Sequence, residues 1–123
     1  MTDQILKGKL TKPEIDGFLA LPSMARLATA VPSKADSNFF QPHNVPVWFH
    51  WDGENLYISA FQSTRKLKEV QQNPFIAVII DLQEAIDGAQ AVLMEGKAEV
   101  VLLPHTVQEM SRVIYTKYMG PEG

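Results

Sequence analysis

The centre of the sequence carries a strong signal for a β-hairpin. A β-branched and aromatic run at 45–51 (VPVWFHW) is followed by Asp52-Gly53 and then by a second such run at 56–61 (LYISAF). Asp-Gly between two runs of this kind is typical of a tight turn between antiparallel strands. Because Pro46 cannot donate a backbone hydrogen bond, we expect it at a sheet edge or at a bulge.

Other β runs lie on both sides of this hairpin. We predict a strand at 24–31 and a buried strand at 75–81, where the apolar run is nearly continuous. Residues 91–103 predict one long strand, or two strands joined by a bulge at Gly96. The intervening segments 32–42, which contains Phe39 and Phe40, and 82–89 are interpreted as loops.

Three helices accompany these strands. Thr11 and Glu14 have the spacing of a capping box and predict a short helix that ends before Pro22. A second helix is predicted at 63–72. An apolar stripe from 107 to 118 predicts a closing helix that ends at Gly120-Pro121.

The order of these elements predicts the fold class. Most strands that are neighbours in sequence are joined by short turns, so the sheet should be largely antiparallel. A hydrophobic antiparallel sheet needs closure or a second layer. We therefore expect a mainly β fold, a small Greek-key barrel with peripheral helices. No repeat or linker divides the 123 residues, which predicts a single domain over 1–123.

Composition excludes several classes of protein. The hydrophobic fraction of 46% excludes disorder over the whole length. A net charge of −3 argues against nucleic acid or an anionic membrane as the main partner. The absence of cysteine removes disulfides, thiolate metal sites and cysteine nucleophiles. With no signal peptide and no membrane-length apolar stretch, a cytoplasmic protein is expected.

A basic segment at the predicted second helix is the first candidate site. Two hydroxyl residues, Ser63 and Thr64, precede Arg65, Lys66 and Lys68. Cations are unfavourable at a helix N-terminus, which already carries partial positive charge. A bound phosphate would engage the free amides, hydroxyls and cations together. The alternative is a solvated basic helix face.

The aromatic strand is the second candidate. A proline interrupts this strand and leaves backbone groups unpaired, which could form hydrogen bonds with the polar edge of a planar heterocycle. Trp48 or Phe49 would then contact its apolar face. The alternative is an aromatic core strand. His43, His50 and His105 lack metal-ligand spacing, so no metal site is predicted. No nucleophile motif or paired carboxylate is present, and no catalytic residue is assigned.

Taken in order, these motifs resemble a known family. The segments concerned are Ala25-Arg26-Leu27-Ala28-Thr29, Pro42-His43-Asn44-Val45-Pro46-Val47-Trp48-Phe49, Trp51-Asp52-Gly53, Leu56-Tyr57-Ile58-Ser59, Thr64-Arg65-Lys66-Leu67, Asn73-Pro74 and Glu95-Gly96-Lys97-Ala98-Glu99-Val100. Together they resemble the pyridoxamine 5'-phosphate oxidase-like, FMN-binding split-barrel family. The resemblance extends over about 18–118.

The resemblance implies a split β-barrel homodimer that binds FMN, or in one branch a deazaflavin cofactor, at the subunit interface. It implies that Ser63, Thr64, Arg65 and Lys66 hold the flavin phosphate, with Ser59 beside it. The flavin ring would run along Val45, Pro46, Val47 and Trp48. Family members commonly carry a further strand after the last helix. This sequence stops soon after that helix, so we expect the second subunit to complete the pocket.

The expected activity is that of an FMN-binding oxidoreductase, which transfers electrons or hydride between the flavin and a small-molecule substrate. The family's pyridoxine-phosphate-binding residues have no clear match here, so pyridoxamine phosphate oxidation is not assigned. Alternatives are a deazaflavin-dependent reductase and a non-catalytic flavin- or haem-binding module. An oligonucleotide-binding barrel, with Trp48, Phe49 and Tyr57 as stacking platforms, conflicts with the net acidity.

Overall fold

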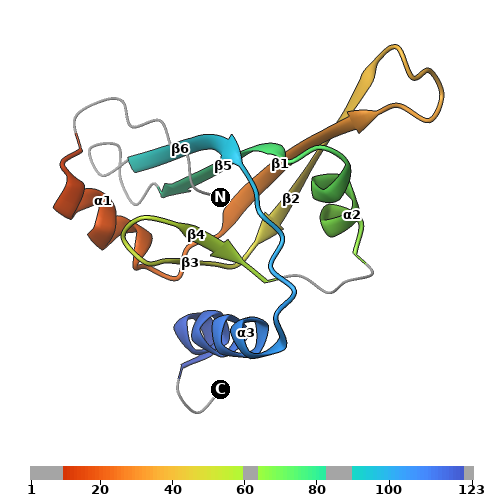
Figure 1. Cartoon of the computed structure of the whole chain (residues 1–123). Coiled ribbons are helices and arrows are strands. Elements are labelled where there is room, and N and C mark those ends of the chain that lie inside the picture. The colour runs from red at the N-terminus through yellow and green to blue at the C-terminus, as the bar shows by residue number, and fades with distance from the viewer. Residues whose placement is uncertain (1–9, 60–63, 83–89, 121–123) are drawn as a thin grey trace.

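A computed structural model describes residues 10–59, 64–82 and 90–120 (Figure 1). Three helices and six strands occur in these ranges. In chain order they are α1 (Lys12–Leu19), β1 (Ala25–Pro32), β2 (Phe40–Val47), β3 (Phe49–Trp51), β4 (Leu56–Ile58), α2 (Arg65–Gln72), β5 (Phe75–Leu82), β6 (Gln90–Lys97) and α3 (Pro104–Met119).

The strands form two sheets around one core. The larger sheet has the order β2-β1-β5-β6 and the smaller one pairs β3 with β4; each of these pairings is antiparallel. Side chains from both sheets and from α1 meet in a single buried cluster, which includes Phe18, Phe49, Leu56, Val78 and Met94. The predicted fold class, a mainly β antiparallel split barrel with peripheral helices, is confirmed.

The predicted central hairpin forms as expected. Phe49 pairs with Ile58 and Trp51 with Leu56. The carboxylate of Asp52 accepts hydrogen bonds from the backbone amides of Glu54 and Asn55, at 2.8 and 2.7 Å. Gly53 has a φ of 102°, a conformation that costs glycine little. The turn chemistry read from Asp52-Gly53 therefore fixes the register of β3 and β4.

The expected continuous strand at 45–51 is wrong, because the chain changes sheets at Trp48. β2 belongs to the larger sheet and β3 to the smaller one. β2 is an edge strand, and Pro46 lies on it opposite Arg26 of β1. The edge position predicted for Pro46 is thus confirmed. Continuous β propensity identifies strand conformation but does not reveal which sheet a residue joins.

The expected loop at 32–42 is also too long, because Pro32 belongs to β1 and residues 40–42 belong to β2. β1 and β2 pair continuously from Ala25–Val47 to Pro32–Phe40. The hairpin they form extends past the rest of the molecule at the upper right of Figure 1. The polar residues and prolines of this segment gave a loop-like pattern, although long-range pairing with β1 decides the conformation. Phe39 and Phe40 are 67% and 63% exposed.

The strands β5 and β6 correct two further expectations. Gly96 pairs directly with Ile76 in an unbroken register, so there is no bulge at this position. β6 ends at Lys97, and residues 98–103 have no regular secondary structure. β5 is buried on one face only, since Val78 is fully buried whereas Phe75 is 68% exposed. The strand lies centrally, but the described residues leave one face of its sheet uncovered, with Phe75, Ile79 and Leu93 exposed on it.

The helices follow their predicted positions closely. The capping box of α1 is present, with the Thr11 and Glu14 side chains each bonded to the other's backbone amide. α2 begins at Arg65 rather than at residue 63, and Thr64 is its N-cap residue. Asn73 ends α2, and Gly120 ends α3 with a φ of 85°.

Candidate functional site

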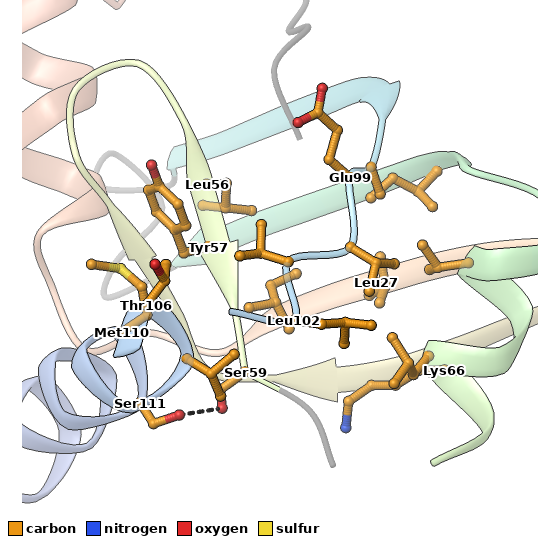
Figure 2. A pocket seen from close by; sticks show the side chains of 18 residues that line it. Leu27, Leu56, Tyr57, Ser59, Lys66, Glu99, Leu102, Thr106, Met110 and Ser111 are labelled. Carbon is orange, nitrogen blue, oxygen red and sulfur yellow. Dashed lines mark hydrogen bonds between the residues drawn. The ribbon is translucent and has the colours of Figure 1, made fainter. Parts of the chain in front are cut away.

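A cavity of about 240 Å³ lies between β4, α2, the extended stretch 98–103 and α3 (Figure 2). Its walls are mainly aliphatic and include Leu27, Leu56, Leu102 and Met110. Polar groups interrupt these walls: the cavity is also lined by Tyr57, Ser59, Lys66, Glu99, Thr106 and Ser111. An apolar chamber with a few convergent polar groups is the usual form of a small-molecule site.

Two predicted cofactor-binding residues line this cavity: Lys66, predicted to hold the flavin phosphate, and Ser59, predicted to lie beside it. Ser59 follows directly after β4, and its hydroxyl lies 3.1 Å from the hydroxyl of Ser111 on α3. Lys66 reaches the cavity from the first turn of α2 (Figure 2). Ser59 and Lys66 thus come from different parts of the chain and line the same cavity.

The other predicted phosphate-binding residues lie at the start of α2. Thr64 is the N-cap residue, with an extended backbone (φ −75°, ψ 151°). Arg65 is the first residue of the helix, and its side chain is 62% exposed. Ser63 lies outside the described residues. Thr64, Arg65 and Lys66, which are consecutive at the start of α2, are called the basic patch below, and Lys66 is the one of them that lines the cavity.

A buried carboxylate that the sequence analysis did not single out lies next to this patch. Glu69 of α2 is 5% exposed. Its Oε1 accepts a hydrogen bond from the Thr29 hydroxyl at 3.0 Å and lies 2.6 Å from Nδ1 of His43. Its Oε2 accepts from Nε of Arg65 at 3.1 Å. Only the spacing of Arg65 and Glu69, four residues apart on one helix, was visible in the sequence.

The pKa of Glu69 is lowered in spite of this burial. Burial alone raises the pKa of the carboxyl group, but hydrogen bonds from His43, Arg65 and Thr29 together outweigh it. Glu69 is therefore ionised at neutral pH, and Arg65 has a charged partner. Of the four charged side chains Arg65, Lys66, Lys68 and Glu69, three are cationic, so the local balance is +2.

The predicted wall of the flavin ring lies elsewhere in the chain. None of Val45, Pro46, Val47 and Trp48 lines the cavity. Val47 is buried in the core, and Pro46 is exposed on the edge strand β2. Trp48 stacks on Tyr118 of α3, with ring centroids 4.6 Å apart and planes 3° apart. Within one chain, the residues predicted to line the flavin ring therefore do not share the cavity with Ser59 and Lys66.

The last turn of α3 anchors the helix that forms one side of the cavity. The Tyr118 hydroxyl donates to the carbonyl of Ser23 at 2.6 Å and accepts from the Phe49 amide at 3.2 Å. The Lys117 ammonium group donates to the carbonyls of Leu19 and Phe49, at 3.0 and 3.2 Å. It also lies 3.6 Å from the centre of the Phe49 ring. α3 is thereby tied to α1 and to β3.

Other classes of site find little support in the described residues. Within these ranges, no three His, Asp or Glu side chains are placed to hold a metal ion. Phe49 is fully buried, so it cannot stack on a nucleobase as the oligonucleotide-binding alternative requires. No helix in the described part of the chain is long and apolar enough to cross a membrane.

Comparison with known proteins identifies the family. The family model for pyridoxamine 5'-phosphate oxidase matches residues 11–122. The chain belongs to this family. A search of curated proteins found none that matches this chain.

Solved structures share the fold of this pyridoxamine 5'-phosphate oxidase family member. A conserved hypothetical protein from Mycobacterium tuberculosis has a TM-score of 0.79 and 23% identity, over 98% of this chain and 71% of the other. A protein named F420 reductase has a TM-score of 0.70 and 21% identity, over 95% and 81% of the two chains. An FAD-binding protein from Mesorhizobium loti has a TM-score of 0.61 and 22% identity, over 91% and 80%.

Proposed function

We propose that this chain binds FMN and acts as an oxidoreductase on a small molecule. One observation carries the proposal: the start of α2, with Thr64, Arg65 and Lys66, adjoins an apolar cavity that Ser59 and Lys66 also line. Membership of the pyridoxamine 5'-phosphate oxidase family supports the same reading.

The chemistry of these groups suits a phosphate. A phosphate has several acceptor oxygens, and it would receive hydrogen bonds from hydroxyls, from a guanidinium, from an ammonium group and from backbone amides at the start of α2. The local balance of +2 at residues 65–69 matches a phosphate dianion, although the whole chain carries −3. The charged groups lie close enough for attraction to act within a Debye length of about 8 Å.

The aliphatic walls would exclude water from the flavin ring. When bound, a flavin supplies hydride and electron transfer, and the protein supplies binding and orientation. In this proposal Arg65 and Lys66 hold the phosphate, and Ser59 and Ser111 form the polar side of the chamber. No protein residue is assigned a proton-transfer role.

We further propose a homodimer. Ile79 of β5 and Leu93 of β6 are directly opposite each other and are 38% and 45% exposed on the uncovered face of the larger sheet. Apolar patches of this kind mark interaction surfaces. We expect the flavin to lie between the two subunits. The segment 45–48 at the sheet edge does not line the cavity of its own chain, so a second copy would be needed to bring this segment into the site.

A deazaflavin cofactor is the second candidate, because the fold is shared with a protein named F420 reductase at a TM-score of 0.70. A non-catalytic flavin- or haem-binding module of the same fold is the third. The absorption spectrum of the purified protein separates flavin, deazaflavin and haem. Turnover of a reduced nicotinamide or deazaflavin with an electron acceptor then separates an enzyme from a binding module.

The phosphate site is tested with the double variant Arg65→Ala plus Lys66→Ala. Loss of two charge-assisted contacts is expected to weaken FMN binding about a hundredfold and to leave the purified protein colourless. The matched control, Lys97→Ala plus Arg112→Ala, removes the same charge from exposed positions and should keep its colour. Wild-type protein that binds neither FMN nor a deazaflavin, by titration or by a rise in Tm, would refute the proposal.

A further inference from the structure

Glu69 is held on three sides by groups from three elements. Thr29 belongs to β1, His43 to β2 and Arg65 to the first turn of α2. Thr29 is itself only 4% exposed. Buried carboxylates are costly unless they are fully hydrogen-bonded, and this one has donors at both oxygens. The place of its carboxylate is therefore set by the sheet rather than by α2 alone.

The bond to Arg65 uses one edge of the guanidinium. It is made through Nε, which is the one described hydrogen bond of this side chain. A guanidinium has five N–H donors in a rigid planar fork, so four donors on the two Nη atoms are left for other acceptors. The Glu69 side chain is 6% exposed and that of Arg65 62%, so the pair has an inner and an outer member.

Resting on the proposed phosphate site, we propose that Glu69 is a positioning residue. It holds Arg65 by Nε, so that the Nη donors of the guanidinium are presented to the flavin phosphate in a fixed orientation. Thr29 and His43 fix Glu69 in turn, so strands β1 and β2 set the position of the guanidinium that binds the phosphate. A free arginine would lose side-chain entropy when it binds the phosphate, and a pre-positioned one has already lost it.

The charge of Glu69 and its role in positioning Arg65 predict opposite effects of substituting Glu69 on the affinity for FMN. Removing the carboxylate leaves the patch more positive, which by charge alone would tighten binding of a phosphate. Removing the tether frees Arg65, which would weaken it. The substitution Glu69→Gln keeps the shape of the side chain and removes its charge, so the direction of the change in affinity decides between the two roles.

The experiment compares FMN with riboflavin, which has the same ring system and no phosphate. Dissociation constants are measured by flavin-fluorescence titration for the wild type, Glu69→Gln and the control Glu54→Gln, an exposed glutamate in the β3–β4 turn. We expect Glu69→Gln to weaken FMN about tenfold, the lower end of the loss seen when a group that orients a metal ligand is removed, and to leave riboflavin unchanged. Glu54→Gln should resemble the wild type.

A second variant tests the geometry without disturbing the buried carboxylate. Arg65→Lys keeps the charge on an exposed side chain but has no Nε–H within a planar fork, so it should lose the FMN-over-riboflavin preference about as much as Glu69→Gln does. The double variant should lose little more than either single variant.

Four results would overturn the proposal: unchanged FMN affinity in Glu69→Gln, tighter FMN binding, an equal loss for FMN and riboflavin, or an unaltered preference in Arg65→Lys. Failure of the proposed function itself has a different signature. It would appear in the wild type, as no preference for FMN over riboflavin and none for a phosphate-bearing deazaflavin over its phosphate-free form.

Discussion

Lys117 is a cation placed where water is partly excluded. Its ammonium group is bonded to two backbone carbonyls and lies over the Phe49 ring. Burial lowers the pKa of Lys117 from 10.5 to about 8. The charged form therefore costs free energy in the folded state that it does not cost in the unfolded chain.

This shift predicts a pH dependence of stability. Between about pH 8 and the ordinary lysine range, the unfolded chain binds more protons at this position than the folded protein, so the free energy of unfolding should rise with pH. Lys117→Met removes that rise. Urea unfolding at about pH 7.5 and about pH 9.5, below the ordinary tyrosine range, checks it. An equal pH response in wild type and variant would contradict the assignment.

Part of the candidate site could be predicted from the sequence and part could not. The cationic segment Arg65–Lys66 was recognisable, because its charges oppose the helix dipole. The role of Glu69 was not, because Thr29 and His43 reach it from positions 40 and 26 residues away along the chain. Partners in a polar network are set by sheet pairing, and a single sequence does not contain that pairing.

At the scale of elements, α3 depends on a small contact at its end. Among the described residues of this helix, Ile114 is the one fully buried side chain, whereas Val107, Tyr115 and Met119 are at least 40% exposed. The hydroxyl of Tyr118 bridges the Ser23 carbonyl and the Phe49 amide. We infer that this bridge does much to hold the helix in place.

The substitution Tyr118→Phe tests the bridge while keeping the ring on Trp48. Loss of both hydrogen bonds, one of which serves the amide of a buried residue, should lower the free energy of unfolding by about 1–3 kcal/mol. Tyr115→Phe is the matched control, since Tyr115 is 47% exposed and its loss of a hydroxyl should cost little. Equal stability of the two variants in urea would show that the bridge is unimportant.

Element boundaries were predictable wherever a local signal set them. Asp52-Gly53 gave the hairpin, the Thr11–Glu14 box gave α1, and Gly120 gave the end of α3. The start of α2 at Arg65, predicted two residues too early, is a local error. The larger errors concern pairing between segments: the full length of β2, the change of sheet at Trp48, and the end of β6 at Lys97. Local composition does not report which strand lies alongside, so these features required the structure.

At the scale of the whole molecule, the uncovered face of the larger sheet is the feature that a second copy would explain. The face opposite the core carries the Ile79–Leu93 pair and Phe75. Water contact with these side chains is unfavourable, and burying them would contribute about 25 cal/mol for each Å² removed from water.

The proposed homodimer is tested with Leu93→Lys. Light scattering should give a dimer for the wild type at micromolar concentration and a monomer for this variant, since a lysine directly opposite Ile79 would lie desolvated in the interface. Leu21→Lys makes the same chemical change at another exposed leucine and should remain dimeric. A monomeric wild type would exclude this interface.

The change of sheet at Trp48 has a consequence for insertions and deletions. One residue separates β2 from β3, and the side chains of Phe49 and Trp51 reach the core because β3 starts in the correct phase. Adding or removing one residue at this corner would turn every side chain of β3 to the opposite side of its sheet. The tip of the β1–β2 hairpin at 33–39 carries no such phase requirement. Homologous chains should therefore differ in length at this tip and keep a constant spacing across Trp48.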